Sequence, residues 1–99
     1  MAEALNDQQV TERLSKLSGW GREGGTISKT FKLDTYMAGL AFASAIGTVC
    51  EARDHHPDMN IGWKKVTVSF TTHDAGSQLT EKDFDAAEAI DALGYPKAG

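Results

Sequence analysis

Two stretches of this chain alternate apolar and polar side chains, and this pattern constrains the fold more than any other feature. Residues 26–33 and residues 64–72 both show the period of two that is typical of strands with one buried face. A Gly-Gly turn precedes the first stretch and joins it to a short strand over residues 19–23. A weaker strand over residues 59–63 precedes the second stretch. The pattern therefore predicts two β-hairpins.

Segments with helical periodicity surround these hairpins. The first begins at an Asn6 cap and runs toward Gly19. The second starts after an Asp34 cap and runs from about residue 35 to Asp54 or His55, and the third covers residues 80–93. The order α-β-β-α-β-β-α predicts an α+β fold, in which a four-stranded, mainly antiparallel sheet carries three helices on one face.

Size and charge restrict the protein class. A chain of 99 residues is enough for one domain, spanning residues 1–99, with a modest core. The net charge is −4 and there is no run of Lys or Arg, which argues against direct nucleic-acid binding. Cys50 is the only cysteine, so we expect no internal disulfide and a reducing, cytoplasmic location. The longest apolar stretch, residues 37–50, is shorter than the roughly 18–20 residues that span a bilayer, so no membrane association is expected.

All three histidines lie between residues 55 and 73. Imidazole is the side chain whose ordinary pKa, about 6.5, allows proton gain and loss near neutral pH. If the second helix continues to His55, Glu51 lies on the same face and can hydrogen-bond to that imidazole. His56 should then point elsewhere, and the second hairpin can bring His73 beside both. The cluster indicates proton transfer or metal binding.

Two alternatives to proton transfer remain open for the histidines, and two roles remain open for Asp83. Glu51, His55 and His73 could supply three ligands to a metal with one open position. The histidines could instead be ordinary surface residues, since a helix C-terminus favours a cation. Asp83 lies three residues after Thr80, so it could complete a helix cap or pair with a protonated imidazole.

Small residues recur at every fourth position of the second helix. These residues, Gly39, Ala43 and Gly47, form one line on its surface. A helical glycine costs about 1 kcal/mol relative to alanine. The line therefore predicts that another backbone packs closely here, either within the chain or across an interface between copies.

One set of spacings resembles a known family signature. Glu51, three residues, His55-His56-Pro57, five residues, Trp63, nine residues, His73 and then Asp83 are similar to the pattern of the pterin-4a-carbinolamine dehydratases. The resemblance covers residues 5–93. It implies elimination of water from a 4a-hydroxytetrahydropterin to give the quinonoid dihydropterin, which recycles the cofactor of aromatic amino-acid hydroxylases. Such an elimination needs no metal or redox cofactor.

The resemblance also implies roles and partners. His55 and His73 would transfer protons, His56 would orient the pterin, Glu51 would fix His55, and Asp83 would fix His73. The remaining pterin contacts would come from Asp54, Thr71, Thr72 and Asp74. Family members form homodimers or homotetramers. Animal members also pair with a homeodomain transcription factor through the second helix, so a non-catalytic dimerisation module with a nuclear pool is the alternative function.

Overall fold

The computed structural model describes residues 2–96, so the ends of the predicted domain, residues 1 and 97–99, lie outside the described residues. The elements follow the predicted order α-β-β-α-β-β-α, with one added 3-10 turn, η1. Their bounds are α1 Asp7–Leu14, β1 Gly21–Glu23, β2 Thr26–Lys32, α2 Tyr36–Ala52, β3 Asp58–Gly62, β4 Lys65–Phe70, η1 His73–Ala75 and α3 Glu81–Asp91.

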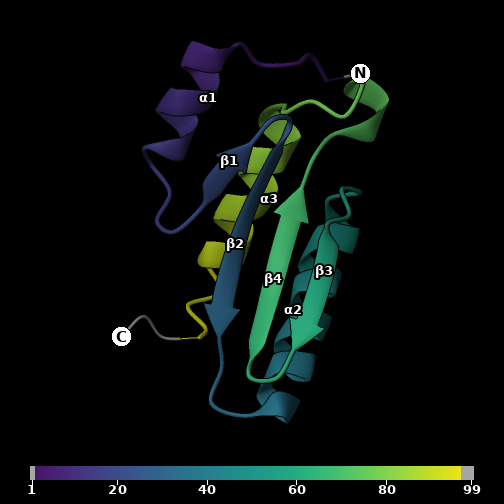
Figure 1. The fold of residues 1–99 in the computed structure, drawn as a ribbon. Coiled ribbons are helices and arrows are strands. Elements are labelled where there is room, and N and C mark those ends of the chain that lie inside the picture. Colours follow the sequence, from purple (N-terminus) through teal and green to yellow (C-terminus); the bar gives the residue numbers. More distant parts are fainter. Residues whose placement is uncertain (1, 97–99) are drawn as a thin grey trace.

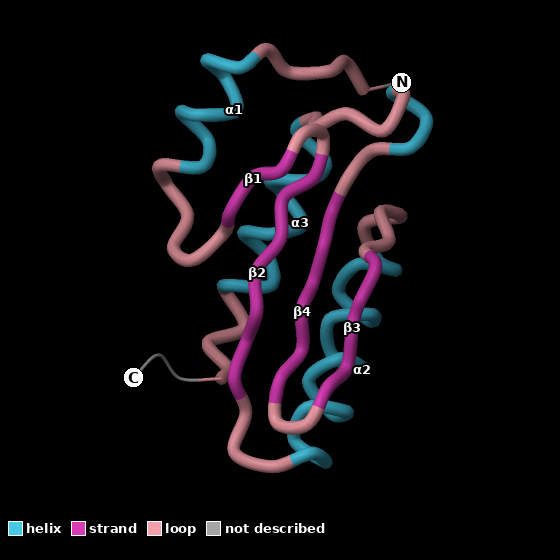
Figure 2. Tube along the Cα trace, in the orientation of Figure 1, coloured by secondary structure: helices cyan, strands magenta, loops and turns pink. Residues whose placement is uncertain are grey.

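The strands form one sheet in the order β1-β2-β4-β3, and every neighbouring pair is antiparallel. Tight turns join β1 to β2 and β3 to β4, as the tube in Figure 2 shows, so both predicted hairpins are confirmed. α2 and α3 lie behind this sheet in Figure 1. The predicted fold class is therefore confirmed, and the strand ends differ from the prediction by at most two residues.

The alternation of the two central strands builds the core. Val66, Val68 and Phe70 of β4 are fully buried and point toward the helices. Phe42 of α2 and Phe84 of α3 cover them and are almost completely buried. Removing such side chains from water provides most of the stabilising free energy, at about 25 cal/mol per Å² of apolar surface. The core therefore holds the C-terminal end of α2 and the N-terminal end of α3 against the end of β4.

The helix ends were predicted unevenly. Asn6 caps α1 as expected, with its side chain accepting from the N–H of Gln9 at 2.8 Å. The cap of α2 is Thr35, because its hydroxyl accepts from the N–H of Ala38 at 3.0 Å, and the predicted Asp34 cap is wrong by one residue. α2 also ends earlier than predicted, and this difference decides the geometry of the site.

The close backbone packing predicted for the small residues of α2 is not made within the described chain. A Cβ atom added at Gly39 would meet only a side-chain methyl group of Val66, at 3.6 Å, and one added at Gly47 would meet nothing within 4 Å. The two glycines of this line therefore have no close backbone neighbour among residues 2–96. Among the same residues, no helix combines the length and the apolar character that crossing a bilayer requires.

Candidate active site

The last turn of α2 decides where the first two histidines lie. α2 ends at Ala52, and Asp54 follows with a φ of 52°, in the left-handed region that Asp tolerates better than most residues with a Cβ. The N–H of His55 donates to the carbonyl of Cys50 at 3.2 Å, and the N–H of Asp54 donates to that of Glu51 at 3.1 Å. These two bonds form a Schellman motif, which ends the helix and turns His55 toward the core.

Both predicted carboxylate–histidine pairs are wrong. The Glu51 carboxylate lies 2.6 Å from Nε2 of His56, and not on His55. The Asp83 carboxylate lies 2.7 Å from Nε2 of His55, and not on His73. The predicted Glu51–His55 contact required a helix that continued to residue 55. Because α2 ends three residues earlier, the chain reverses after the helix. As a result His56, and not His55, meets the Glu51 carboxylate.

Asp83 is fully buried and all of its contacts are made by donors. Oδ1 accepts from His55, while Oδ2 accepts from the Thr80 N–H at 2.9 Å and from the Thr72 hydroxyl at 2.8 Å. Asp83 therefore completes the cap of α3 and also binds an imidazole. Both roles that the sequence left open for Asp83 are present in the structure. A carboxylate only accepts, so Nε2 of His55 donates and Nδ1 keeps its lone pair in the neutral ring.

The end of β4 forms a wall behind His55. The ring of Phe70 stacks on the imidazole, with 5.9 Å between the ring centroids and 10° between the planes. Two residues farther on, Thr72 leaves the strand, and His73 opens the η1 turn with an exposed side chain. The ring of His73 makes no hydrogen bond with any residue from 2 to 96. The His55 ring is therefore held by the Asp83 carboxylate and by the Phe70 ring, whereas His73 remains accessible.

A cavity of about 290 Å³ lies where the α2 end, the β4 end and α3 meet. All seven residues predicted to contact a ligand line it, together with Lys82. We call it the three-histidine cavity; its lining residues are Asp54, His55, His56, Thr71, Thr72, His73, Asp74 and Lys82. The predicted meeting of the three imidazoles is thus present in the fold. Glu51 and Asp83 stand behind this lining as the carboxylate partners of His56 and His55.

Sequence reasoning missed two residues of the site. Lys82 lies in the first turn of α3, directly before Asp83. The only signal in the sequence that this turn faces the histidines was the possible role of Asp83 as a helix cap. Thr80 was expected to cap the helix, but its hydroxyl also lies 2.7 Å from that of Thr72. This contact joins the end of β4 to the start of α3 through two buried hydroxyls.

The arrangement suits proton transfer better than metal binding. Among residues 2–96, no group of three or more His, Cys, Asp and Glu side chains is placed to hold a metal ion. The predicted ligand set of Glu51, His55 and His73 is separated, because Glu51 contacts His56 on the exposed side. What remains is a small polar cavity that holds one oriented imidazole and two accessible ones.

Comparison with known proteins identifies the family of this chain. The profile of the family described as pterin 4 alpha carbinolamine dehydratase matches residues 3–93. The chain belongs to this family. A relative from Roseiflexus sp. (strain RS-1), whose name places it among the pterin-4-alpha-carbinolamine dehydratases, is 50% identical over 94% of this chain and 99% of its own length. A similarly named relative from Natronomonas pharaonis is 44% identical over 94% of this chain and 98% of its own length.

Two solved structures share the fold. A crystal structure of a transcriptional coactivator/pterin dehydratase from Brucella melitensis has a TM-score of 0.85 at 26% identity and covers 92% of this chain and 98% of that one. A pterin dehydratase-like protein described as a RuBisCO assembly factor of the α-carboxysome has a TM-score of 0.62 at 23% identity, covering 77% of this chain and 87% of that one. The second likeness concerns the fold alone. Membership of the dehydratase family makes the chain an enzyme of the hydro-lyase class that acts on pterins.

Proposed function

We propose that the three-histidine cavity removes water from a 4a-hydroxytetrahydropterin and releases the quinonoid dihydropterin, in the cytoplasm. The observation that carries this proposal is the meeting of His55, His56 and His73 on one small cavity. Its volume of about 290 Å³ is at the lower end of the range for small-molecule sites, which suits a bicyclic ring. The product would be returned to aromatic amino-acid hydroxylases after reduction.

The reaction needs two proton transfers on neighbouring atoms. The bond between C4a and the hydroxyl oxygen breaks, the oxygen leaves as water after it is protonated, and a C4a–N5 double bond forms as N5 loses its proton. We assign these transfers to His55 and His73. Asp83 positions His55 by accepting from its Nε2, and it stabilises the imidazolium when that ring is protonated. His56, on the exposed rim, would orient the pterin ring together with the polar lining.

The test is turnover of a synthetic 4a-hydroxytetrahydropterin by single variants. His55→Ala and His73→Ala should each lower kcat by about 100-fold or more, because a positioned acid or base typically contributes 10²–10⁴-fold. Unfolding by urea, followed by circular dichroism, separates this loss from a loss of stability. Turnover near the wild-type rate in both folded variants would refute the assignment.

A second candidate is a dimerisation module that acts without catalysis. The name of the Brucella melitensis structure joins a transcriptional coactivator with a pterin dehydratase, and α2 exposes Met37 and Tyr36, at 68% and 47%. Gly39 and Gly47 on α2 also lack a close backbone neighbour among the described residues. We propose that α2 contributes to a homodimer or homotetramer. Light scattering of Met37→Glu tests the assembly, and the turnover assay separates an enzyme from a scaffold.

A further inference from the structure

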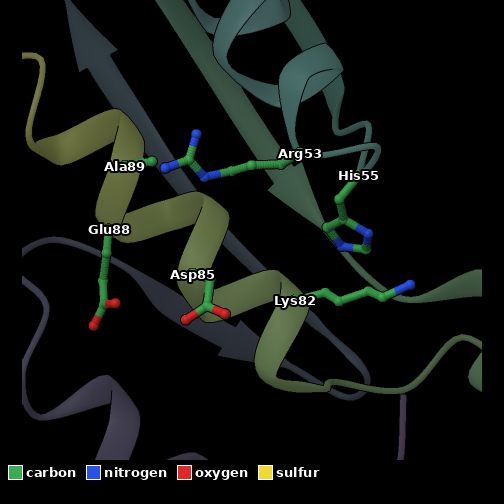
Figure 3. A pocket seen from close by; sticks show the side chains of 6 residues that line it. All are labelled: Arg53, His55, Lys82, Asp85, Glu88 and Ala89. Carbon is green, nitrogen blue, oxygen red and sulfur yellow. The ribbon is translucent and has the colours of Figure 1, made fainter. Parts of the chain in front are cut away.

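A second hollow adjoins the three-histidine cavity. It has a volume of about 540 Å³ and shares His55 and Lys82 with that cavity. We call it the tail groove, and it lies between the end of α2 and the outer surface of α3 (Figure 3). Its lining consists of Arg53, His55, Lys82, Asp85, Glu88 and Ala89. A molecule held beside His55 in the smaller cavity therefore has a larger polar space directly next to it.

The charges in the tail groove are not evenly distributed. Figure 3 shows that Arg53 reaches across the groove toward Ala89, while the carboxylates of Asp85 and Glu88 point away from its guanidinium. Those two carboxylates face α1, where Arg13 lies 3.3 Å from Asp85 and 3.6 Å from Glu88. Arg13 also pairs with Glu81, so one guanidinium is shared among three carboxylates and offsets part of the negative charge of this wall.

The two cations of the groove have no such partner. Within residues 2–96, neither Arg53 nor Lys82 has a carboxylate within 4.0 Å. Figure 3 shows them on either side of His55, with Arg53 directed over α3 and Lys82 directed away past the imidazole. A cationic ligand would be repelled by both. A neutral one would gain little from a guanidinium that stays hydrated.

We propose that the tail groove receives the side chain of the pterin and that Arg53 selects substrates whose side chain ends in an anionic group. This proposal rests on the proposed function, because it takes the pterin ring to lie in the three-histidine cavity. A guanidinium binds a phosphate or a carboxylate through two parallel hydrogen bonds, whereas a lysine ammonium acts as a point charge. Arg53 is therefore the specificity-determining residue, and phosphate ester and carboxylate tails are its two sources of negative charge.

The experiment compares the binding of three stable dihydropterins, measured by fluorescence titration. The probes are 6-trihydroxypropyl-7,8-dihydropterin, its terminal phosphate monoester, and 7,8-dihydrofolate, whose tail carries two carboxylates. The readout is the ratio of Kd for the neutral probe to Kd for each anionic probe. Binding is measured in wild type, Arg53→Gln, Arg53→Lys and a charge-matched control, Lys16→Gln, whose side chain is exposed and lines neither hollow.

We expect wild type to bind at least one anionic probe about tenfold more tightly than the neutral probe, because charge-assisted hydrogen bonds are stronger than neutral ones and exposure of Arg53 to water limits the gain. Arg53→Gln should abolish this ratio, Arg53→Lys should restore part of it, and Lys16→Gln should keep it. The probe that loses its advantage identifies the anion as phosphate or carboxylate.

Equal binding of all three probes by wild type, or an unchanged ratio in Arg53→Gln, would overturn the proposal. Failure of the proposed function has a different signature. In that case the protein would not turn over any 4a-hydroxypterin, and the binding ratio would still report whether Arg53 selects an anionic tail.

Discussion

His55 and His56 each place Nε2 within hydrogen-bond distance of a carboxylate oxygen, at 2.7 Å from Asp83 and 2.6 Å from Glu51. The surroundings of the two pairs are opposite. The side chains of His55 and Asp83 are 10% and 0% exposed, whereas those of His56 and Glu51 are 58% and 78% exposed. Nearly equal distances therefore join groups that water screens very differently. The comparison shows that the contact distance does not decide what a histidine–carboxylate pair contributes.

Exposure to solvent decides what each histidine–carboxylate pair contributes. Around the exposed pair, water and salt weaken the attraction, and such pairs typically contribute about 0–1 kcal/mol. In the buried pair, the Asp83 carboxylate has lost its hydration, so its negative charge is stabilised only by the hydrogen-bond donors that replace water. Asp83 thus holds one imidazole firmly, while His56 stays free to reorient toward a ligand.

The largest effect is expected from Asp83→Ala. It would leave the Thr72 hydroxyl, the Thr80 N–H and the His55 ring without their shared acceptor, all in buried positions. We expect the free energy of unfolding to fall by about 3–5 kcal/mol. Urea denaturation measures the change. Asp85→Ala is the matched control on the same helix, because its carboxylate is 63% exposed, and it should cost less than about 1 kcal/mol. Similar losses in the two variants would break the comparison.

A smaller effect is expected from Thr72→Val, which keeps the shape of the side chain and removes one donor to Asp83. The hydroxyl also contacts Thr80 at 2.7 Å. The free energy of unfolding should fall by about 1–2 kcal/mol. A double-mutant cycle with Asp83→Ala tests whether the two residues act together. If Thr72→Val cost the same in both backgrounds, the buried network would not be a unit.

The buried thiol of Cys50, the residue before Glu51, provides a further test of how burial affects an ionisable group. Burial raises the pKa of the Cys50 thiol, and the nearby Arg53 charge offsets part of this rise. As the pH rises, the thiol ionises in the unfolded chain before it ionises in the folded protein. The contribution of Cys50 to stability is therefore complete below the unfolded pKa, and it is lost as the pH rises through the folded pKa. Stability measured from about pH 7.5 to pH 9.5, on either side of the ordinary thiol value near 8.5, should therefore fall slightly more in wild type than in Cys50→Ala. Parallel pH curves for the two proteins would show that burial does not control this thiol.

The smallest effect is expected from Glu51→Gln. The amide can still meet His56, and the lost charge was exposed. The free energy of unfolding should change by less than about 0.5 kcal/mol, and the difference should disappear at 1 M salt. Thermal unfolding at low and high salt provides the measurement. A loss as large as that of Thr72→Val would mean that the exposed pair is structural.

Much of the site could be predicted from the sequence because its signals are local. The alternation of β4 placed Thr71 and Thr72 at a strand end, and the spacing from Thr80 to Asp83 indicated a helix cap as one of two roles for Asp83, a cap that the structure contains. The pairing of carboxylates with imidazoles could not be predicted in the same way. It depends on Asp54, which follows the end of α2 in a left-handed conformation; a glycine at this position would have been a clearer signal of the turn.

The sequence by itself determined the order of elements, the fold class and most of the residues that gather around the cavity. Period-two and helical patterns are set by neighbouring residues, and they fix which side chains share a face. Only the tertiary structure decided that Asp83 holds His55, that Glu51 meets His56, and that Arg53 and Lys82 flank a second hollow. Those outcomes depend on a single reversal of the chain and on burial, both of which follow from how distant segments pack together.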